Sequence, residues 1–136
     1  MNREMTVDGV RVADDTDTYV IAEIGNNHQG DVEKCKEMFK VAKQHCGVTA
    51  VKLQKRDNRT LFTRAMYHSE YHSENAFADT YGTHREKLEF GRDEYVELKR
   101  YAKELGITVN RRRLSNDIDP KIAQRGVTRE KRRRAA

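Results

Sequence analysis

Residues 19–54 decide the fold of this chain, and they read YVIAEIGNNHQGDVEKCKEMFKVAKQHCGVTAVKLQ. The run 19–24 is apolar on both faces except at Glu23, and a continuous apolar run predicts a strand buried on both sides, as in parallel sheets. Residues 50–54 predict a second strand, with a turn and a helical repeat in between. Strand, helix and strand in this order predict an α/β protein with parallel strands.

The segment between the two strands carries the signals of a turn and a helix. Residues 25–31 are a turn by composition, and Asp31 is a suitable N-cap. Gly47 suits the position that ends the helix. Neither cysteine has metal-ligand or redox spacing, so Cys35 is expected to pack as a small hydrophobe. One helical face collects the apolar residues Val32, Cys35, Met38, Phe39, Ala42 and Cys46.

Further segments extend this pattern. An Asp-Gly pair between apolar residues predicts a short hairpin over 7–10. The polar segment 55–90 is expected to be a long loop without strong structure, functional or disordered. Residues 92–105 predict a second helix closed by Gly106, and 107–109 begin a third strand.

The positive charge is concentrated at the C-terminal end. Residues 110–136 hold 10 Lys and Arg against 3 Asp and Glu, a net charge of +7, whereas residues 1–109 carry −2 and the whole chain +5. Three arginines at 111–113 stand where the third strand should continue, and burying unpaired charge is costly. We therefore predict a folded part, 1–109, and a basic tail, 110–136, that is disordered or out of frame. The alternative is a basic arm that binds nucleic acid or another anionic surface.

The sequence argues against a membrane protein. No apolar run approaches membrane-spanning length, and the N-terminus lacks the apolar region of a signal peptide. We therefore expect a cytoplasmic protein.

Charged side chains at the C-terminal ends of the two predicted strands are the strongest signal of chemistry. Enzymes built from βα units place active-site groups at these strand ends, where Glu23 and Lys52 are expected. A Lys can hold a phosphate or carboxylate, and a Glu can exchange a proton with a hydroxyl or carbonyl oxygen. The two residues can instead simply pair with each other across neighbouring strands. Gln54, on the face of Lys52, can donate to a sugar hydroxyl or hydrogen-bond a loop.

The sequence does not decide the role of the first turn, residues 25–31. Asn26, Asn27 and His28 can line the mouth of a site or act as metal ligands, or they can serve turn geometry, capping and packing. The histidines of the polar segment are unevenly spaced. We therefore predict no metal site in this chain.

Three ordered motifs can be compared with known families. They are AEIGNNHQGD at 22–31, AVKLQ at 50–54 and TYGTHREKLEF at 80–90. The first two resemble the first-strand and second-strand signatures of the N-acetylneuraminate (sialic acid) synthase family, and the third resembles a motif in the loop that follows. The helix 92–105 continues the similarity, which covers about residues 5–109.

The resemblance implies a TIM-type (β/α) barrel enzyme that condenses phosphoenolpyruvate with N-acetylmannosamine, its 6-phosphate or a related sugar. The product is a nine-carbon 2-keto acid, and phosphate is released. By position, Glu23 matches the family's catalytic acidic residue beside the sugar and Lys52 its phosphoenolpyruvate-binding lysine. Gln54 matches a sugar-side neighbour, and Asn75 a sugar-contacting asparagine. A divalent metal, often manganese, is the implied cofactor, and the family's ligands for it fall later than the end of this chain.

A complete barrel of this type takes about 250 residues. We therefore expect the first two to three βα units of an incomplete barrel, and a chain that is inactive alone. The alternative is a non-catalytic fragment that binds a full-length subunit. A homo-oligomer is left open, and nucleic acid is the least favoured partner.

Overall fold

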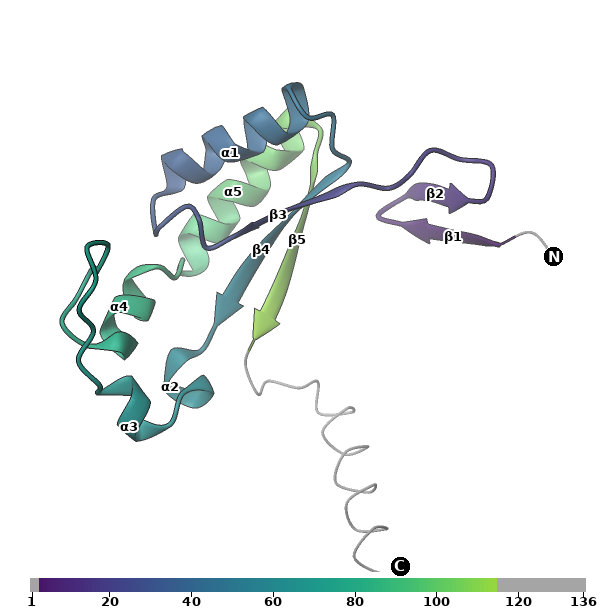
Figure 1. The fold of residues 1–136 in the computed structure, drawn as a ribbon. Helices are drawn as coiled ribbons and strands as arrows, with labels where there is room; N and C mark the ends of the chain where they lie inside the picture. Colours follow the sequence, from purple (N-terminus) through teal and green to yellow (C-terminus); the bar gives the residue numbers. More distant parts are fainter. Residues whose placement is uncertain (1–2, 115–136) are drawn as a thin grey trace, which may run out of the picture.

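A computed structural model describes residues 3–114. The described strands form a two-stranded antiparallel hairpin and a three-stranded sheet in the order β3-β4-β5, in which both pairings are parallel (Figure 1). The predicted α/β class with parallel strands is confirmed. The elements in chain order are β1 (Glu4–Val7), β2 (Val10–Ala13), β3 (Ile21–Gly25), α1 (Val32–Gln44), β4 (Ala50–Arg56), α2 (Asn58–Leu61), α3 (Arg64–Tyr67), α4 (Tyr81–Lys87), α5 (Arg92–Leu105) and β5 (Thr108–Leu114).

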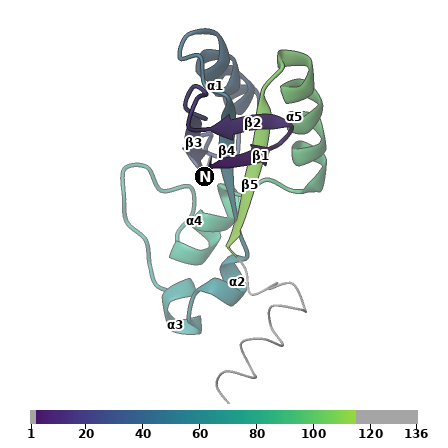
Figure 2. The ribbon, with the colours of Figure 1, turned by 90° about the vertical axis from the view of Figure 1, so that its right-hand side faces the viewer.

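The N-terminal hairpin turns at Asp8 and Gly9. Val7 lies opposite Val10, and the two residues between them have φ angles of 49° and 80°. These left-handed values are what a two-residue type I′ turn requires. The predicted hairpin is therefore confirmed. It projects away from the parallel strands in Figure 1 and lies in front of them in Figure 2, where that side of the molecule faces the viewer.

The two long helices begin and end largely as their sequences predict. The Asp31 carboxylate accepts a hydrogen bond from the Lys34 N–H at 3.0 Å at the start of α1. Gly106, with a φ of 68°, ends α5 in the left-handed conformation. The placement of Cys46 on the apolar face of α1 is wrong, because α1 ends at Gln44 and Cys46 is exposed. No helix of the described part is long and apolar enough to cross a membrane.

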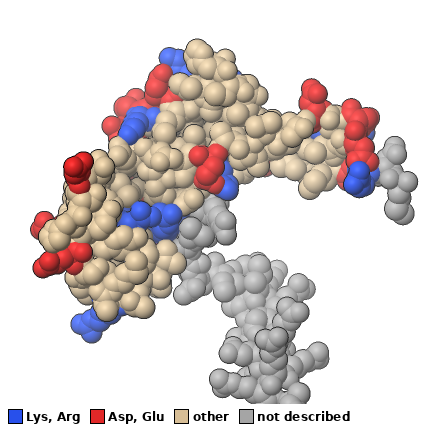
Figure 3. All heavy atoms as spheres, viewed as in Figure 1, with Lys and Arg blue, Asp and Glu red and all other residues tan. Residues whose placement is uncertain are grey.

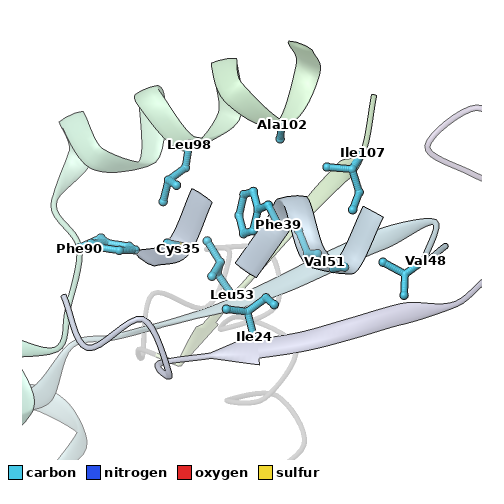
Figure 4. Packing of buried hydrophobic residues seen from close by; sticks show 11 residues of the cluster. Ile24, Cys35, Phe39, Val48, Val51, Leu53, Phe90, Leu98, Ala102 and Ile107 are labelled. Atoms are coloured by element: carbon cyan, nitrogen blue, oxygen red, sulfur yellow. The ribbon is translucent and has the colours of Figure 1, made fainter. Parts of the chain in front are cut away.

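α1 and α5 lie side by side on one side of the parallel sheet and form the core with it (Figures 1 and 4). Phe39 of α1, Leu53 of β4 and Leu98 of α5 are 0% exposed, and Cys35 is equally buried, as predicted. Full burial of one large apolar side chain contributes about 1.5–3 kcal/mol. The buried cluster consists of Ile24, Cys35, Phe39, Ala42, Val48, Val51, Leu53, Phe90, Leu98, Ala102 and Ile107.

Residues 55–90 are more regular than their composition indicates. The prediction of a long loop without strong structure is wrong, because the segment holds the short helices α2, α3 and α4. Each begins at a side chain that accepts a hydrogen bond from a backbone N–H of its first turn, namely Asp57, Thr63 and Thr80. Such caps stabilise a helix by about 1 kcal/mol, but helices of four to seven residues are too short to show an apolar period.

The third strand continues beyond the predicted boundary at residue 109. β5 covers Thr108–Leu114 and pairs in parallel register with β4 along its whole length. The predicted strand end at residue 109 is therefore too early. Pairing with β4 is made by backbone N–H and C=O groups, so it does not depend on the residue types at 111–113. Residues 115–136 lie outside the described residues, so the basic tail and its nucleic-acid alternative stay predictions.

Candidate functional site

The charged residues of the first two parallel strands stand directly opposite each other. Glu23 and Lys52 are register partners in the pair of β3 and β4, and Lys52 Nζ forms an ion pair with Glu23 Oε2. Of the two interpretations left open by the sequence, pairing across strands is the one present in this structure. The Glu23 side chain remains 42% exposed and the Lys52 side chain 33% exposed, so a ligand can reach both.

A bulge at the end of β3 turns the chain across the strand ends. The register shifts between Glu23 and Gly25, and Gly25 has a φ of 60°, which favours glycine. A Cβ atom at this glycine would lie 3.8 Å from Glu23 Oε1 and 3.8 Å from Gln54 Nε2. Two of the predicted site residues therefore flank the same turn.

An open pocket of about 440 Å³ lies at these strand ends. It brings together Glu23, Gln54 and Asn75, the last from the polar segment. Lys52 is not among its lining residues and reaches the site through its ion pair with Glu23. Further lining residues used below are Asn26, Asn27, Gln29, Arg56, His84 and Arg85.

Arg56, the last residue of β4, ties the two strand ends together. Its Nη2 donates to Gln54 Oε1 at 2.5 Å, and its Nη1 donates to Asn26 Oδ1 at 3.4 Å. Burial and the positive charge of Arg85 lower the pKa of Arg56, while the carboxylate of Glu89 raises it. The two hydrogen bonds hold the guanidinium at the pocket through neutral amide oxygens.

A buried carboxylate anchors this network. The Glu89 side chain is 6% exposed and lies 3.5 Å from Lys55 Nζ. Its Oε1 accepts from Asn26 Nδ2 at 3.2 Å, and its Oε2 accepts from the Arg56 backbone N–H at 3.0 Å. A buried charge is tolerated when it is paired and hydrogen-bonded in this way. The bonds of Glu89 join the turn after β3 to the end of β4.

Aromatic residues of the polar segment pack around His84. Its Nδ1 accepts from the Phe77 N–H at 3.2 Å, and its ring centroid lies 4.4 Å from that of Tyr71. Burial and then the positive charge of Arg85 lower the pKa of His84. A neutral His84 therefore holds the loop that carries Asn75.

His28 packs and does not line the pocket. It is 1% exposed, its Nδ1 accepts from the Gly30 N–H at 3.1 Å, and its ring stacks on Phe90 with centroids 3.9 Å apart. Burial lowers the pKa of His28 to about 4. Packing is thus the interpretation that the structure favours for His28, whereas Asn26 and Asn27 line the pocket.

The described residues do not fit a metal ion. In this part of the chain, no group of three or more His, Cys, Asp or Glu side chains is arranged to hold one. His72 forms a surface pair with Glu70 at 3.1 Å, and both side chains are exposed. No chemical step is therefore assigned to a metal held by residues 3–114.

Sequence reasoning assigned no role to Arg56, Arg85 or Glu89. Arg56 follows Gln54 by two residues, so the alternation of a strand already places both side chains on one face. Arg85 and Glu89 belong to the motif at 80–90, and no local pattern predicts that they reach the ends of β3 and β4.

Comparisons with known proteins agree with the motifs. A model of the NeuB family matches residues 38–112. The N-acetylneuraminate-9-phosphate synthases of Homo sapiens and Drosophila melanogaster are 45% and 48% identical to this chain over 89 residues. Each match covers 65% of this chain and 24% of the relative, so the chain spans about a quarter of their length.

A solved structure shares the fold. The N-acetylneuraminic acid (sialic acid) synthetase of Leptospira borgpetersenii serovar Hardjo-bovis, solved with citrate, has a TM-score of 0.63 and 22% identity, over 85% of this chain and 35% of that one. The family model, in turn, covers more than half of the 136 residues, in a segment that runs from α1 into β5. The family predicted from the motifs is therefore confirmed, and this chain belongs to the NeuB family.

Proposed function

We propose that residues 3–114 form the first part of an active site that condenses phosphoenolpyruvate with N-acetylmannosamine, its 6-phosphate or a related amino sugar. The products are a nine-carbon 2-keto acid and phosphate. One observation carries the proposal: the pocket at the C-terminal ends of β3 and β4 collects Glu23, Gln54 and Asn75, with Lys52 bonded to Glu23. Such strand ends are where βα enzymes bind their substrates.

Each residue has a role that its chemistry supports. Lys52 holds the carboxylate or phosphate of phosphoenolpyruvate as a point charge. Glu23 exchanges a proton with an oxygen of the sugar. The amides of Gln54 and Asn75 hydrogen-bond sugar hydroxyl or acetamido groups. Because the free site holds Glu23 and Lys52 as an ion pair, an anionic substrate must compete with Glu23 for the lysine.

The 136-residue chain is proposed to bind these substrates without turning them over. The described part supplies three parallel strands, whereas a barrel of this type has eight. The divalent metal of the family reaction, often manganese, is proposed to be held outside residues 3–114. We therefore expect no phosphate release from phosphoenolpyruvate and N-acetylmannosamine by this chain alone.

Nuclear magnetic resonance of the ¹⁵N-labelled chain tests the proposal. Phosphoenolpyruvate should shift the amide signals of Lys52 and its neighbours, and N-acetylmannosamine should shift those of Gln54 and Asn75. Lys52→Gln should weaken phosphoenolpyruvate binding. Lys40→Gln, the same change on an exposed lysine of α1, should not. Absence of shifts at the pocket, or equal losses in the two variants, would contradict the proposed site.

Exposed apolar side chains favour a second candidate, a non-catalytic chain that binds a longer family member. Val20, directly before β3, and Ile21, its first residue, are each 46% exposed, although strands of parallel sheets are normally covered on both faces. Size-exclusion chromatography of a mixture should then show co-elution that Ile21→Thr abolishes. Val96→Thr, the same kind of change at an exposed residue of α5, should preserve it. Separate elution of the wild-type chains would remove this candidate.

A further inference from the structure

Asn75 reaches the pocket from a loop, residues 71–79, whose two ends are tied together. The Tyr71 N–H donates to the Asp79 carbonyl oxygen at 2.9 Å, and the residues just outside this pair form an isolated antiparallel bridge. These bonds hold the ends of the loop and not its middle. The place of Asn75 at the strand ends therefore depends on a further contact.

One hydrogen bond joins the middle of the loop to the rest of the described protein. The Phe77 N–H donates to Nδ1 of His84 on α4 at 3.2 Å, and the two rings stack with centroids 5.8 Å apart. The other hydrogen bonds of residues 73–78 in the described part are accepted by Ser73, inside the loop. His84 is therefore the residue that fixes the middle of the loop.

The loop places an aromatic face beside hydrogen-bonding groups. Phe77 is 45% exposed and lines the pocket together with Tyr71. A sugar ring carries C–H groups as well as hydroxyls, so it suits a wall that is aromatic on one side and polar on the other. The amides of the pocket are Asn26, Asn27, Gln29, Gln54 and Asn75.

Only a neutral His84 ring can hold the loop in this way. Its Nδ1 accepts from the Phe77 N–H, so the single proton of the neutral ring lies on Nε2. A second proton would occupy Nδ1 and place one N–H donor against another. Protonation of His84 therefore removes the bond that fixes Phe77.

The surroundings of His84 oppose its protonation. Arg85 follows it on α4, Arg56 of β4 and Glu23 of β3 line the same pocket, and the titratable Tyr71 faces the ring from the loop. Figure 3 shows Lys and Arg side chains gathered between α4 and the end of β4, the elements that carry Arg85 and Arg56. Burial and then the positive charge of Arg85 lower the pKa of His84, so the ring is neutral at about pH 7.

We propose that His84 is a positioning residue of this site: its neutral ring holds Asn75 and Phe77 at the ends of β3 and β4 as the sugar side of the pocket, and its protonation releases them. The inference rests on the proposed function and adds a residue that acts on the sugar through the loop. Binding of N-acetylmannosamine should therefore weaken as the pH falls through the pKa of His84.

Titration of N-acetylmannosamine into the ¹⁵N-labelled 136-residue chain at a series of pH values tests this role. The imidazole signals report where His84 takes up its proton, and the amide signals report whether the chain stays folded. His84→Asn keeps an acceptor and does not titrate, so its affinity should not follow the wild-type pH profile. His72→Asn, the same change on an exposed histidine of the same loop, should keep that profile.

A second variant tests the hydrogen bond at a single pH. His84→Phe keeps an aromatic ring and removes the acceptor. At about pH 7.5 it should weaken sugar binding about twofold to tenfold, the effect of one neutral hydrogen bond, and more than His84→Asn does. In the free chain it should also lower the heteronuclear NOE of residues 73–78, which reports motion of the loop.

The outcomes separate this inference from the function on which it rests. Affinity that falls as His84 titrates in the wild type and in His72→Asn, but not in His84→Asn, supports the positioning role. Affinity that stays constant while His84 takes up its proton overturns it, as does equal sugar binding by the wild type and His84→Phe. Both of these results leave sugar binding in place. If N-acetylmannosamine binds to none of the proteins, the proposed function fails and the inference falls with it.

Discussion

Acidification is expected to destabilise this fold through His28. Burial lowers the pKa of His28 from 6.5 to about 4, so the unfolded chain takes up a proton at a higher pH than the folded chain. The stability that neutral His28 contributes is therefore present above about pH 6.5 and is lost as the pH falls towards 4. Between about pH 7.5 and about pH 5 the loss amounts to about 2 kcal/mol. That is a large share of the roughly 5–15 kcal/mol of a typical domain.

Urea unfolding at the two pH values, followed by circular dichroism, measures this loss. His28→Asn is the comparison, because asparagine does not titrate and keeps an acceptor for the Gly30 N–H that His28 Nδ1 now binds. All other titrating groups, including His84, are common to both proteins. The wild-type chain should lose about 2 kcal/mol more than the variant, which moves its midpoint by about 1 M urea. Equal losses in the two proteins would refute the reasoning.

Two further predictions concern buried groups. Glu89→Gln should cost about 1–3 kcal/mol in urea unfolding, because the buried amide cannot replace both oxygens that accept from Asn26 and the neighbouring backbone. Glu104→Gln breaks only an exposed ion pair and should cost about 0–1 kcal/mol. Similar costs for the two variants would show that the buried hydrogen bonds of Glu89 do not stabilise the fold. Burial raises the pKa of the Cys35 thiol to about 12, so a disulfide reagent at about pH 8 should modify exposed Cys46 far faster. Two fast thiols per chain would contradict the buried state of Cys35.

The two long helices could be predicted because their sequence signals involve residues that are close together in the chain. The three- and four-residue repeat that contains Phe39, the Asp31 cap and the left-handed Gly106 each act within a few residues, and the structure places α1 and α5 accordingly. The sequence does not predict the short helices α2, α3 and α4, because capping without an apolar period is a weak signal. Nor does the sequence predict how far β5 extends, because the length of β5 depends on its pairing with the backbone of β4.

The sequence by itself determined the family, the α/β class and the place of Glu23 near the end of β3. The prediction that Lys52 ends its strand is wrong, because β4 continues to Arg56 and Lys52 lies in its middle. Only the tertiary structure decided that Glu23 and Lys52 pair, because their pairing depends on the register in which two strands distant in sequence align. The pocket is likewise a tertiary product. Asn26 and Glu89 are 63 residues apart in sequence and share a hydrogen bond. Contacts between such distant residues produce no period or spacing in the sequence from which they could be predicted.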